Sequence, residues 1–297
     1  MRLNNLRHEH LYITVKEMNS KGYSIKLLCS ILGISRAAYY KWVNREKSDR
    51  ENENEQILHE IKSIYDRVKG IYGYRRLADE YNATHGTAYS DKRFYRLTHI
   101  SGLRAVIRKK RMRYRKTSAD YIAQNLLNRE FTADRANSKW VTDVTEMKYG
   151  NGKKMYLSAI LDLKTREIVS FATGHSNNNQ LVFSTFDLAV QKYPNAHPIL
   201  HSDRGYQYTS NSFKRKIDLA QMTHSMSRVG RCIDNGPMEG FWGTLKSEMY
   251  YLSSFADYAS LVKAIEEYIH FYNYERRQRN LNRMAPMSVR QLLDLAG

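Results

Sequence analysis

Three acidic residues that lie far apart in the sequence, Asp143, Asp203 and Glu239, have the local settings expected of divalent-metal ligands. Asp143 lies inside a predicted strand, Asp203 follows a short apolar run, and Glu239 opens a predicted helix behind a Gly-Pro pair. Carboxylates that are brought together raise each other's pKa, and a hard cation such as Mg²⁺ removes this conflict. Two such ions, about 4 Å apart, would clamp the attacking and leaving oxygens of a phosphoryl transfer.

A lysine extends this set. Lys246 follows Glu239 by seven residues, so both lie on one side of the predicted helix, roughly 10 Å apart along its axis. An acid near the helix start and a lysine two turns later suit a metal ion and a phosphate strand. Taken alone, the pair is better explained by a helix with surface ion pairs, so its meaning depends on the two aspartates. These converge if the strands that precede them pair side by side.

The elements that must position the acids are predicted between residues 137 and 250. The segments KWVTDVTEM, KMYLSAILDL and EIVSFATG are rich in Val, Ile, Tyr and Thr, which predicts three strands, the last two forming a hairpin. A helix is predicted over 179–192, and a further helix over 211–219 lies between two short strands, PILH and MTHS. This order predicts an α/β layer sandwich.

Within this region several polar residues have ordinary interpretations. Asp162 ends a predicted strand and is interpreted as a turn residue. His201 lies two residues before Asp203, so it either touches the site or packs elsewhere. Tyr206 and Tyr208 suit either the core or stacking on an unpaired base, and the sequence leaves both readings open.

The N-terminal third predicts two helical units. In residues 1–48, the segment 23–43 reads as a short helix, a break at Gly33 and a second helix capped by Ser35, the layout of a helix-turn-helix. In residues 49–103, a stripe of Ile57, Ile61 and neighbouring apolar residues precedes two more helices, a second candidate helix-turn-helix.

The charge of the chain is strongly positive and uneven. Residues 1–116 hold 26 Lys and Arg against 12 Asp and Glu, whereas the remainder holds 22 against 18, within a net charge of +18. Residues 104–136 are predicted to be a basic linker, because the segment 104–116 has eight Lys or Arg and no acid. Such an excess indicates a polyanion such as DNA as the partner, although a solvated basic tail is the alternative.

The bulk composition points to an intracellular protein. The two cysteines, Cys29 and Cys232, lack metal-ligand spacing, and no apolar run reaches the length of a membrane helix. The N-terminus also lacks the apolar core of a secretory signal. We therefore expect a cytoplasmic, nucleoid-associated protein.

Together these residues resemble a known family. Asp143, Asp203 and Glu239, with 35 residues between the last two and Lys246 seven further on, resemble the DDE signature of retroviral integrases and of insertion-sequence-three family transposases. The segments WVTDVTEM, HSDRGYQYTS, SMSRVGRCIDNGPMEGFWGTLKSE and YNYERRQRNLNRMAPMSV are similar to the second-frame product of that transposase family, as are LCSILGISRAAYYKW and IYGYRRL. The resemblance runs over nearly the whole chain.

The resemblance implies a ribonuclease-H-like core with a mixed five-stranded sheet at 137–250, preceded by helix-turn-helix units and followed by a helical segment at 251–297. It implies Mg²⁺, with Mn²⁺ as a substitute and two ions per site, held by Asp143, Asp203 and Glu239. It implies that Lys246 contacts DNA, and the retroviral zinc module has no counterpart. The expected partners are element-end and target DNA, further copies of this chain, and an upstream-frame product as a fusion or partner.

Further basic residues are expected to contact DNA. They lie on the second helix of the first unit, in the basic linker and in the loop before the Glu239 helix: Arg36, Lys41, Arg108, Lys109, Lys110, Arg111, Arg113, Arg228 and Arg231.

The predicted function is a DNA transposase that cleaves element ends and joins the freed 3′-OH to another strand. Two alternatives stay open: a catalytically silent DNA-binding regulator of the element, and a ribonuclease-H-like nuclease. The intact acid triplet argues against the regulator, and the basic helical N-terminal third argues against a plain nuclease.

Overall fold

The computed structural model describes residues 9–46, 48–107, 124–128, 130–227 and 235–296. It divides the chain into two compact units, Met1–Val106 and Ile107–Gly297. Within the described ranges, no helix combines the length and the apolar character needed to cross a membrane. The first unit is helical, with α1 Glu9–Ser20, α2 Ile25–Ile31, α3 Arg36–Val43, α4 Asp49–Arg67, α5 Tyr74–His85 and α6 Asp91–Ile100.

Helices α1 to α3 have the layout predicted from the sequence. The break between α2 and α3 uses Gly33, whose φ of +63° is the left-handed conformation that glycine adopts readily. Ser35 then caps α3, because its hydroxyl accepts a hydrogen bond from the backbone N–H of Ala38 at 3.3 Å. Cys29 and Tyr39 are buried in the small core of these helices, which also includes residues of α1.

Helices α4 to α6 correspond to the apolar stripe and the two further helices predicted after residue 49. Ile57 and Ile61 of α4 are fully buried, as the apolar stripe predicts. Glu51 anchors the start of α4: its carboxylate accepts from the backbone N–H of Ser48 at 3.0 Å and pairs with Arg45 at 2.6 Å. These bonds lower the pKa of Glu51 to about 2, and the hydrogen bond from the Ser48 backbone makes the largest contribution.

The second unit contains the five-stranded mixed sheet that the sequence predicted. Its strands are β1 Lys139–Tyr149, β2 Lys153–Asp162, β3 Ile168–Gly174, β4 Ile199–Ser202 and β5 Thr223–Met226. They are arranged in the order β3-β2-β1-β4-β5, with antiparallel pairing among the first three and parallel pairing of β4 to both β1 and β5. The consecutive hairpins β1-β2-β3 therefore occupy one half of the sheet.

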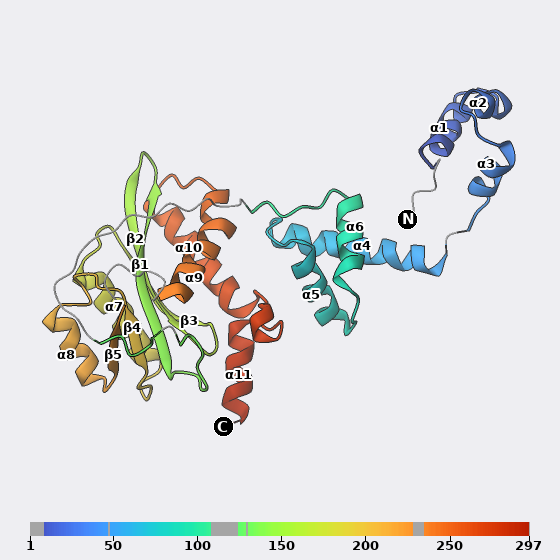
Figure 1. Ribbon diagram of the computed structural model, residues 1–297. Coiled ribbons are helices and arrows are strands. Elements are labelled where there is room, and N and C mark those ends of the chain that lie inside the picture. The colour runs from blue at the N-terminus through green and yellow to red at the C-terminus, as the bar shows by residue number, and fades with distance from the viewer. Residues whose placement is uncertain (1–8, 47, 108–123, 129, 228–234, 297) are drawn as a thin grey trace. The chain divides into compact units, whose positions relative to one another are not determined.

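Helices cover both faces of this sheet (Figure 1). Their bounds are α7 Asn179–Lys192, α8 Asn211–Leu219, α9 Gly236–Glu248, α10 Tyr258–Tyr274 and α11 Pro286–Ala296, with short 3₁₀ turns η2 Tyr250–Leu252 and η3 Arg279–Leu281. Residues of α9 and α10, among them Trp242 and Ile265, pack with Val141 and Leu157 of the sheet. Phe186 of α7 and Phe213 of α8 share a second core with Trp140 and Ile160. Alternation along the strands thus fills two cores, one on each face.

The segment just before β1 packs with the second unit. Leu127 is buried in the same core as α9 and α10. The backbone N–H groups of Leu126 and Leu127 both donate to the hydroxyl of Ser225 on β5, at 3.0 and 3.1 Å. The described part of the predicted linker from residue 124 onward is therefore attached to the sheet.

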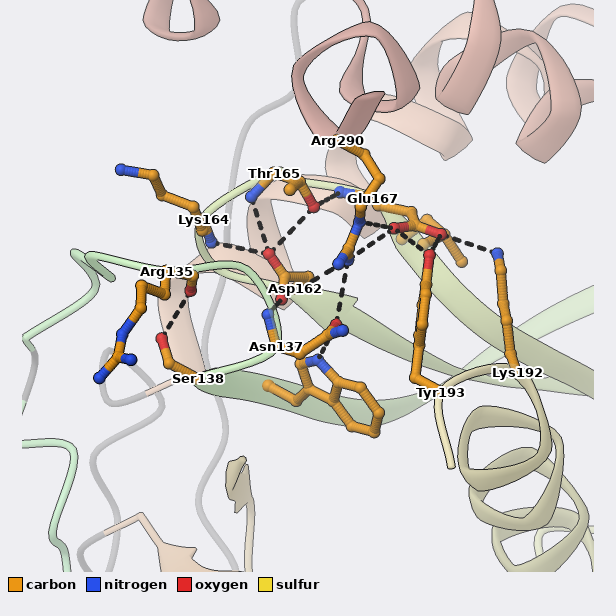
Figure 2. Close-up of polar contacts among 12 residues, drawn as sticks. Arg135, Asn137, Ser138, Asp162, Lys164, Thr165, Glu167, Lys192, Tyr193 and Arg290 are labelled. Atoms are coloured by element: carbon orange, nitrogen blue, oxygen red, sulfur yellow. Dashed lines mark hydrogen bonds and ion pairs between the residues drawn. The ribbon is translucent and has the colours of Figure 1, made fainter. Parts of the chain in front are cut away.

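A buried ionic cluster closes the turn between β2 and β3 (Figure 2). The carboxylate of Glu167 pairs with Arg290 of α11 at 2.8 Å and with Lys192 of α7 at 2.7 Å. Asp162 accepts hydrogen bonds from the backbone N–H groups of Thr165 at 2.7 Å and Asn137 at 2.7 Å. Asp162 is thus the turn residue that the sequence indicated, and Glu167 ties the C-terminal helix to the sheet.

Candidate active site

The sheet register brings Asp143 and Asp203 together. β1 and β4 are parallel neighbours in which Val141 pairs with His201, and each aspartate lies two residues beyond its member of that pair. Asp143 is on β1, and Asp203 is the first residue after β4, so both lie just past the last paired residues of two neighbouring parallel strands, at the same end of that pairing. The predicted convergence depended on side-by-side pairing of these strands, and the structure has that pairing.

Asp143 is in an environment that opposes ionisation. Burial, as the largest cause, together with the charges of Asp203 and Glu239 raises the pKa of its carboxyl to about 7. Hydrogen bonds from the Val144 backbone and the Trp242 indole act in the opposite direction. The Trp242 Nε1–H donates to Asp143 Oδ2 at 3.0 Å. The site therefore concentrates negative charge where little water compensates for it.

Asp203 is held by the loop that follows β4. Burial raises the pKa of its carboxyl, and the backbone N–H of Gly205 acts against this by donating to Oδ1 at 2.8 Å. A side chain at residue 205 would collide here, because a Cβ would lie 3.1 Å from Asp203 Oδ1 and 2.8 Å from Gln207 Oε1. Gly205 thus lets the backbone come close enough to orient the carboxylate.

Glu239 lies one turn into α9, at the edge of the aspartate pair. Met238, Trp242 and Leu245 are buried and fix the helix on the sheet, as the predicted stripe requires, while Glu239 is exposed. Its charge reaches Asp143. Among the residues that the structure describes, no three His, Cys, Asp or Glu side chains are grouped closely enough to hold a metal ion. The structure brings two of the three predicted ligands together and leaves the third beside them.

Lys246 lies two turns further along α9 and is tied to β1. Its Nζ donates to Thr145 Oγ1 at 2.6 Å and to the backbone carbonyl of Glu146 at 3.1 Å. These bonds keep the ammonium group close to the strand that carries Asp143. A positive charge is thereby fixed on the side of α9 where the sequence placed it.

The remaining predicted DNA contacts divide into two groups. Arg36 and Lys41 are exposed on α3 of the first unit. The others lie outside the described residues: Arg108, Lys109, Lys110, Arg111, Arg113, Arg228 and Arg231.

The structure shows the surroundings of the three residues for which the sequence left two interpretations open, His201, Tyr206 and Tyr208. His201 is buried between the hydroxyls of Ser225 and Ser227, at 2.8 and 3.1 Å, so it packs inside the sheet. Tyr208 is a core residue with 2% of its surface exposed, whereas Tyr206 is 58% exposed. Stacking on a base therefore stays possible only for Tyr206.

Two residues beside the acids support the site. The apolar pattern of the sequence assigns Trp242 to the core, and its position three residues after Glu239 also puts it on the same helix face as that acid. The sequence predicts that Asn235 caps or prepares this helix. Asn235 donates from Nδ2 to the carbonyl of Thr142 at 3.0 Å and so fixes the start of α9 against β1. No periodicity indicates this contact, because it joins residues 93 positions apart.

Comparisons with known proteins agree with this architecture. A family model described as an integrase core domain matches residues 133–232, and a second model with the same description matches residues 239–292. A model described as an HTH-like domain matches residues 51–111. The catalytic-core matches cover the sheet, both aspartates and the α9 residue Glu239.

Full-length relatives extend the agreement over the chain. The InsK protein for insertion sequence element IS150 of Escherichia coli (strain K12) is 35% identical over 269 residues, covering 90% of this chain and 94% of that protein. Transposase InsF for insertion sequence IS3A, also of E. coli, is 29% identical over 268 residues, covering 88% and 92%. The HTLV-2 integrase catalytic core domain in complex with magnesium aligns with a TM-score of 0.42 at 20% identity, covering 52% of this chain and 95% of that one. With its integrase core, its HTH-like domain and relatives matched almost end to end, the chain belongs to the insertion-sequence-three family of transposases.

Proposed function

We propose that this protein is the catalytic transposase of its element: it cleaves DNA at the element ends and joins the freed 3′-OH to target DNA. The observation that carries the proposal is the convergence of Asp143 and Asp203 at neighbouring strand positions, with Glu239 beside them. This is the arrangement expected of an integrase core that handles phosphodiesters. Family membership supports the overall reaction, and the acid cluster supports the assignment of residues.

The donor set fits a hard divalent cation. The aspartates offer only carboxylate oxygens, the ligands that Mg²⁺ prefers, and burial raises the pKa values of both, in a site with no described cation paired to them. We propose Asp143, Asp203 and Glu239 as the ligands of two Mg²⁺ ions, with Mn²⁺ as a substitute. When bound, these ions supply Lewis-acid stabilisation and lower the pKa of an attacking water or hydroxyl.

The protein's own residues hold this site in place. Gly205 and Trp242 orient the two aspartate carboxylates by donating hydrogen bonds to them. The exposed Glu239 has room to turn toward the aspartates, because it stands in the first turn of a helix that its apolar face fixes on the sheet. Lys246, fixed against β1, offers a positive charge for a DNA phosphate near the acids.

The proposed partners follow from the charge and from the two units. The helical first unit, with its exposed Arg36 and Lys41, is proposed to bind the element ends, and Arg108, Lys109, Lys110, Arg111, Arg113, Arg228 and Arg231 are proposed to add phosphate contacts. Because two element ends must be held together, we propose a homo-multimer on DNA at the nucleoid. Fusion to an upstream-frame product is the proposed longer form.

The test is a Mg²⁺-dependent assay of the full chain on oligonucleotides that carry the flanking repeats of the element. Cuts at the element end and joined products are expected from the wild-type protein, and neither from Asp203→Asn. Binding without cuts would indicate a regulator. Cuts without joined products would indicate a nuclease of the same fold.

A further inference from the structure

A pocket of about 290 Å³ lies beside α9. Its ten lining residues come from α9, the end of α10, the segment just after α10, the end of β2 and the β2–β3 turn, and they include two arginines and no acid. Gly240 and Thr244 form the α9 side, one and five residues after Glu239. A Cβ at Gly240 would meet nothing within 4 Å, so this side of the helix is bare and open.

Arg166 enters this pocket from a strained backbone. Its φ is +60°, the left-handed region that favours glycine and asparagine and that a long side chain rarely adopts. The cluster of Figure 2 enforces this conformation from both sides. Asp162 accepts hydrogen bonds from the turn before Arg166, and Glu167, directly after it, is bound to Lys192 and Arg290. Strain that is enforced by its surroundings is typical of functional positions.

The charge of Arg166 is not neutralised by an ion pair. Its side chain makes no hydrogen bond or ion pair with the described residues, and the nearby carboxylate of Glu167 is already taken by Lys192 and Arg290. Burial lowers the pKa of the Arg166 guanidinium, which shows that the group is partly removed from water. The second arginine in the pocket, Arg276, is neutralised by Glu248 at 2.8 Å. Within the described part of the chain, Arg166 therefore has no direct ion-pair partner, although the charges of Tyr272 and Asp162 reach it.

A second donor in the pocket lacks an acceptor. Gln278 also lines it, and its Nε2 is a buried side-chain nitrogen without a hydrogen-bond partner in the described part of the chain. A buried amide donor left unsatisfied costs free energy that a bound acceptor would recover. A guanidinium, an amide N–H and a bare helix flank are together complementary to a phosphate oxygen cluster.

We propose that Arg166 and Gln278, with the open flank of α9 at Gly240, form a binding site for one phosphate of the DNA backbone, separate from the acid site. The ligand is assigned as DNA because the pocket has two arginines and no acid in a chain of net charge +18 whose proposed substrate is DNA, and because α9 also carries Glu239. The choice of DNA as the ligand rests on the proposed function. The existence of an anion site does not.

The decisive experiment uses Arg166→Asn in the full chain. Asparagine tolerates the left-handed conformation, so the midpoint of urea unfolding should stay the same or rise. Duplex affinity, measured by fluorescence anisotropy in EDTA, should fall about tenfold for any sequence, and the slope of log affinity against log salt should drop by about one. Lys164→Gln is the matched control, since it removes an equal charge two residues away whose side chain points away from the cluster (Figure 2). It should change affinity little.

A second variant tests the pocket without removing a charge. Gly240→Met improves helix propensity at an open position and should not destabilise the protein, but its side chain should obstruct the flank and weaken DNA binding. Equal affinities of wild type, Arg166→Asn and Gly240→Met would overturn the proposal. So would stabilisation by inorganic phosphate that depends on Arg166 while DNA affinity is unchanged, since the site would then take free phosphate. Because EDTA prevents cleavage, failure here leaves the proposed catalytic function untouched.

Discussion

Two groups of buried acids lie along the same sheet and differ in how their charge is balanced. At the start of β1 and the end of β2, Asp162 and Glu167 are surrounded by donors, and Glu167 has two cationic partners. Further along β1, Asp143 meets Asp203 with one indole N–H and backbone donors but no described cation. The charges of the first group are balanced within the protein, whereas for the second group we propose that a bound divalent cation balances them.

The contrast teaches how a structural acid differs from a functional one. Burying an unpaired charge costs several kcal/mol, so a chain keeps one only where something else compensates for it. The turn cluster has a stabilising role that is visible in its bonds. The aspartate pair lacks such bonds to described cations, its pKa values are raised mainly by burial, and we propose that a bound divalent ion offsets this cost.

The largest expected effect is a loss of DNA cleavage when the aspartate pair is altered. Asp203→Asn should lower the rate of element-end cleavage on the order of 10³-fold or more, because several kcal/mol of transition-state stabilisation by metal depends on it. Its unfolding free energy should not fall, since one of two repelling charges is removed. Gel assays of cleavage and urea unfolding measure the two effects. Glu146→Gln, on the same strand but paired with Lys154, is the control and should retain activity.

The next effect should appear in stability. Glu167→Gln removes the close charge partner of the buried Arg290 and leaves it only the longer contact with Asp162 at 3.9 Å, so the unfolding free energy of the second unit should fall by about 3 kcal/mol. Urea unfolding followed by tryptophan fluorescence measures this. Asp187→Asn breaks a pair with Lys216 whose side chains are 58% and 31% exposed, and should cost less than about 1 kcal/mol. Similar losses in both variants would contradict the contrast drawn here.

A half-buried histidine on β5, His224, which contacts the hydroxyl of Ser202 at 3.1 Å, gives a pH-dependent effect. Burial, and then the charge of His201, lower the pKa of His224 to about 4, while Asp218 acts weakly in the opposite direction. The unfolded chain therefore binds the proton more tightly, so stability should fall as the pH drops from about 6.5 to about 4, by roughly 3 kcal/mol in all. The difference between wild type and His224→Gln across this range isolates the effect. A difference that does not vary with pH would refute it.

The smallest expected effect concerns the indole that orients Asp143. Trp242→Phe keeps the ring in the core but removes the donor to Oδ2, a hydrogen bond to a charged group that contributes about 1.5 kcal/mol. Cleavage should slow about tenfold, with the requirement for divalent metal shifted to higher concentration. Titration of activity against Mn²⁺ measures both. An unchanged metal requirement would show that Trp242 serves only the core.

Much of this architecture could be predicted from the sequence because it depends on local patterns. Strand and helix boundaries followed the apolar periodicity, as for α7, which begins and ends at the predicted residues. The meeting of Asp143 and Asp203 needed one additional assumption, the pairing of β1 with β4. The cluster around Glu167 could not be predicted, because it joins α7, α11 and the β2–β3 turn across 123 residues. Long-range polar contacts of this kind have no periodic signature.

The central claim is that Asp143, Asp203 and Glu239 together bind divalent ions against DNA. The most direct measurement is a crystal structure of the chain with an element-end duplex and Mn²⁺, with the ions located by anomalous scattering. We predict anomalous peaks between the two aspartate carboxylates, with Glu239 turned inward to coordinate one of them. Mn²⁺ bound elsewhere, or bound at the aspartates with the Glu239 carboxylate beyond coordination distance, would contradict the account.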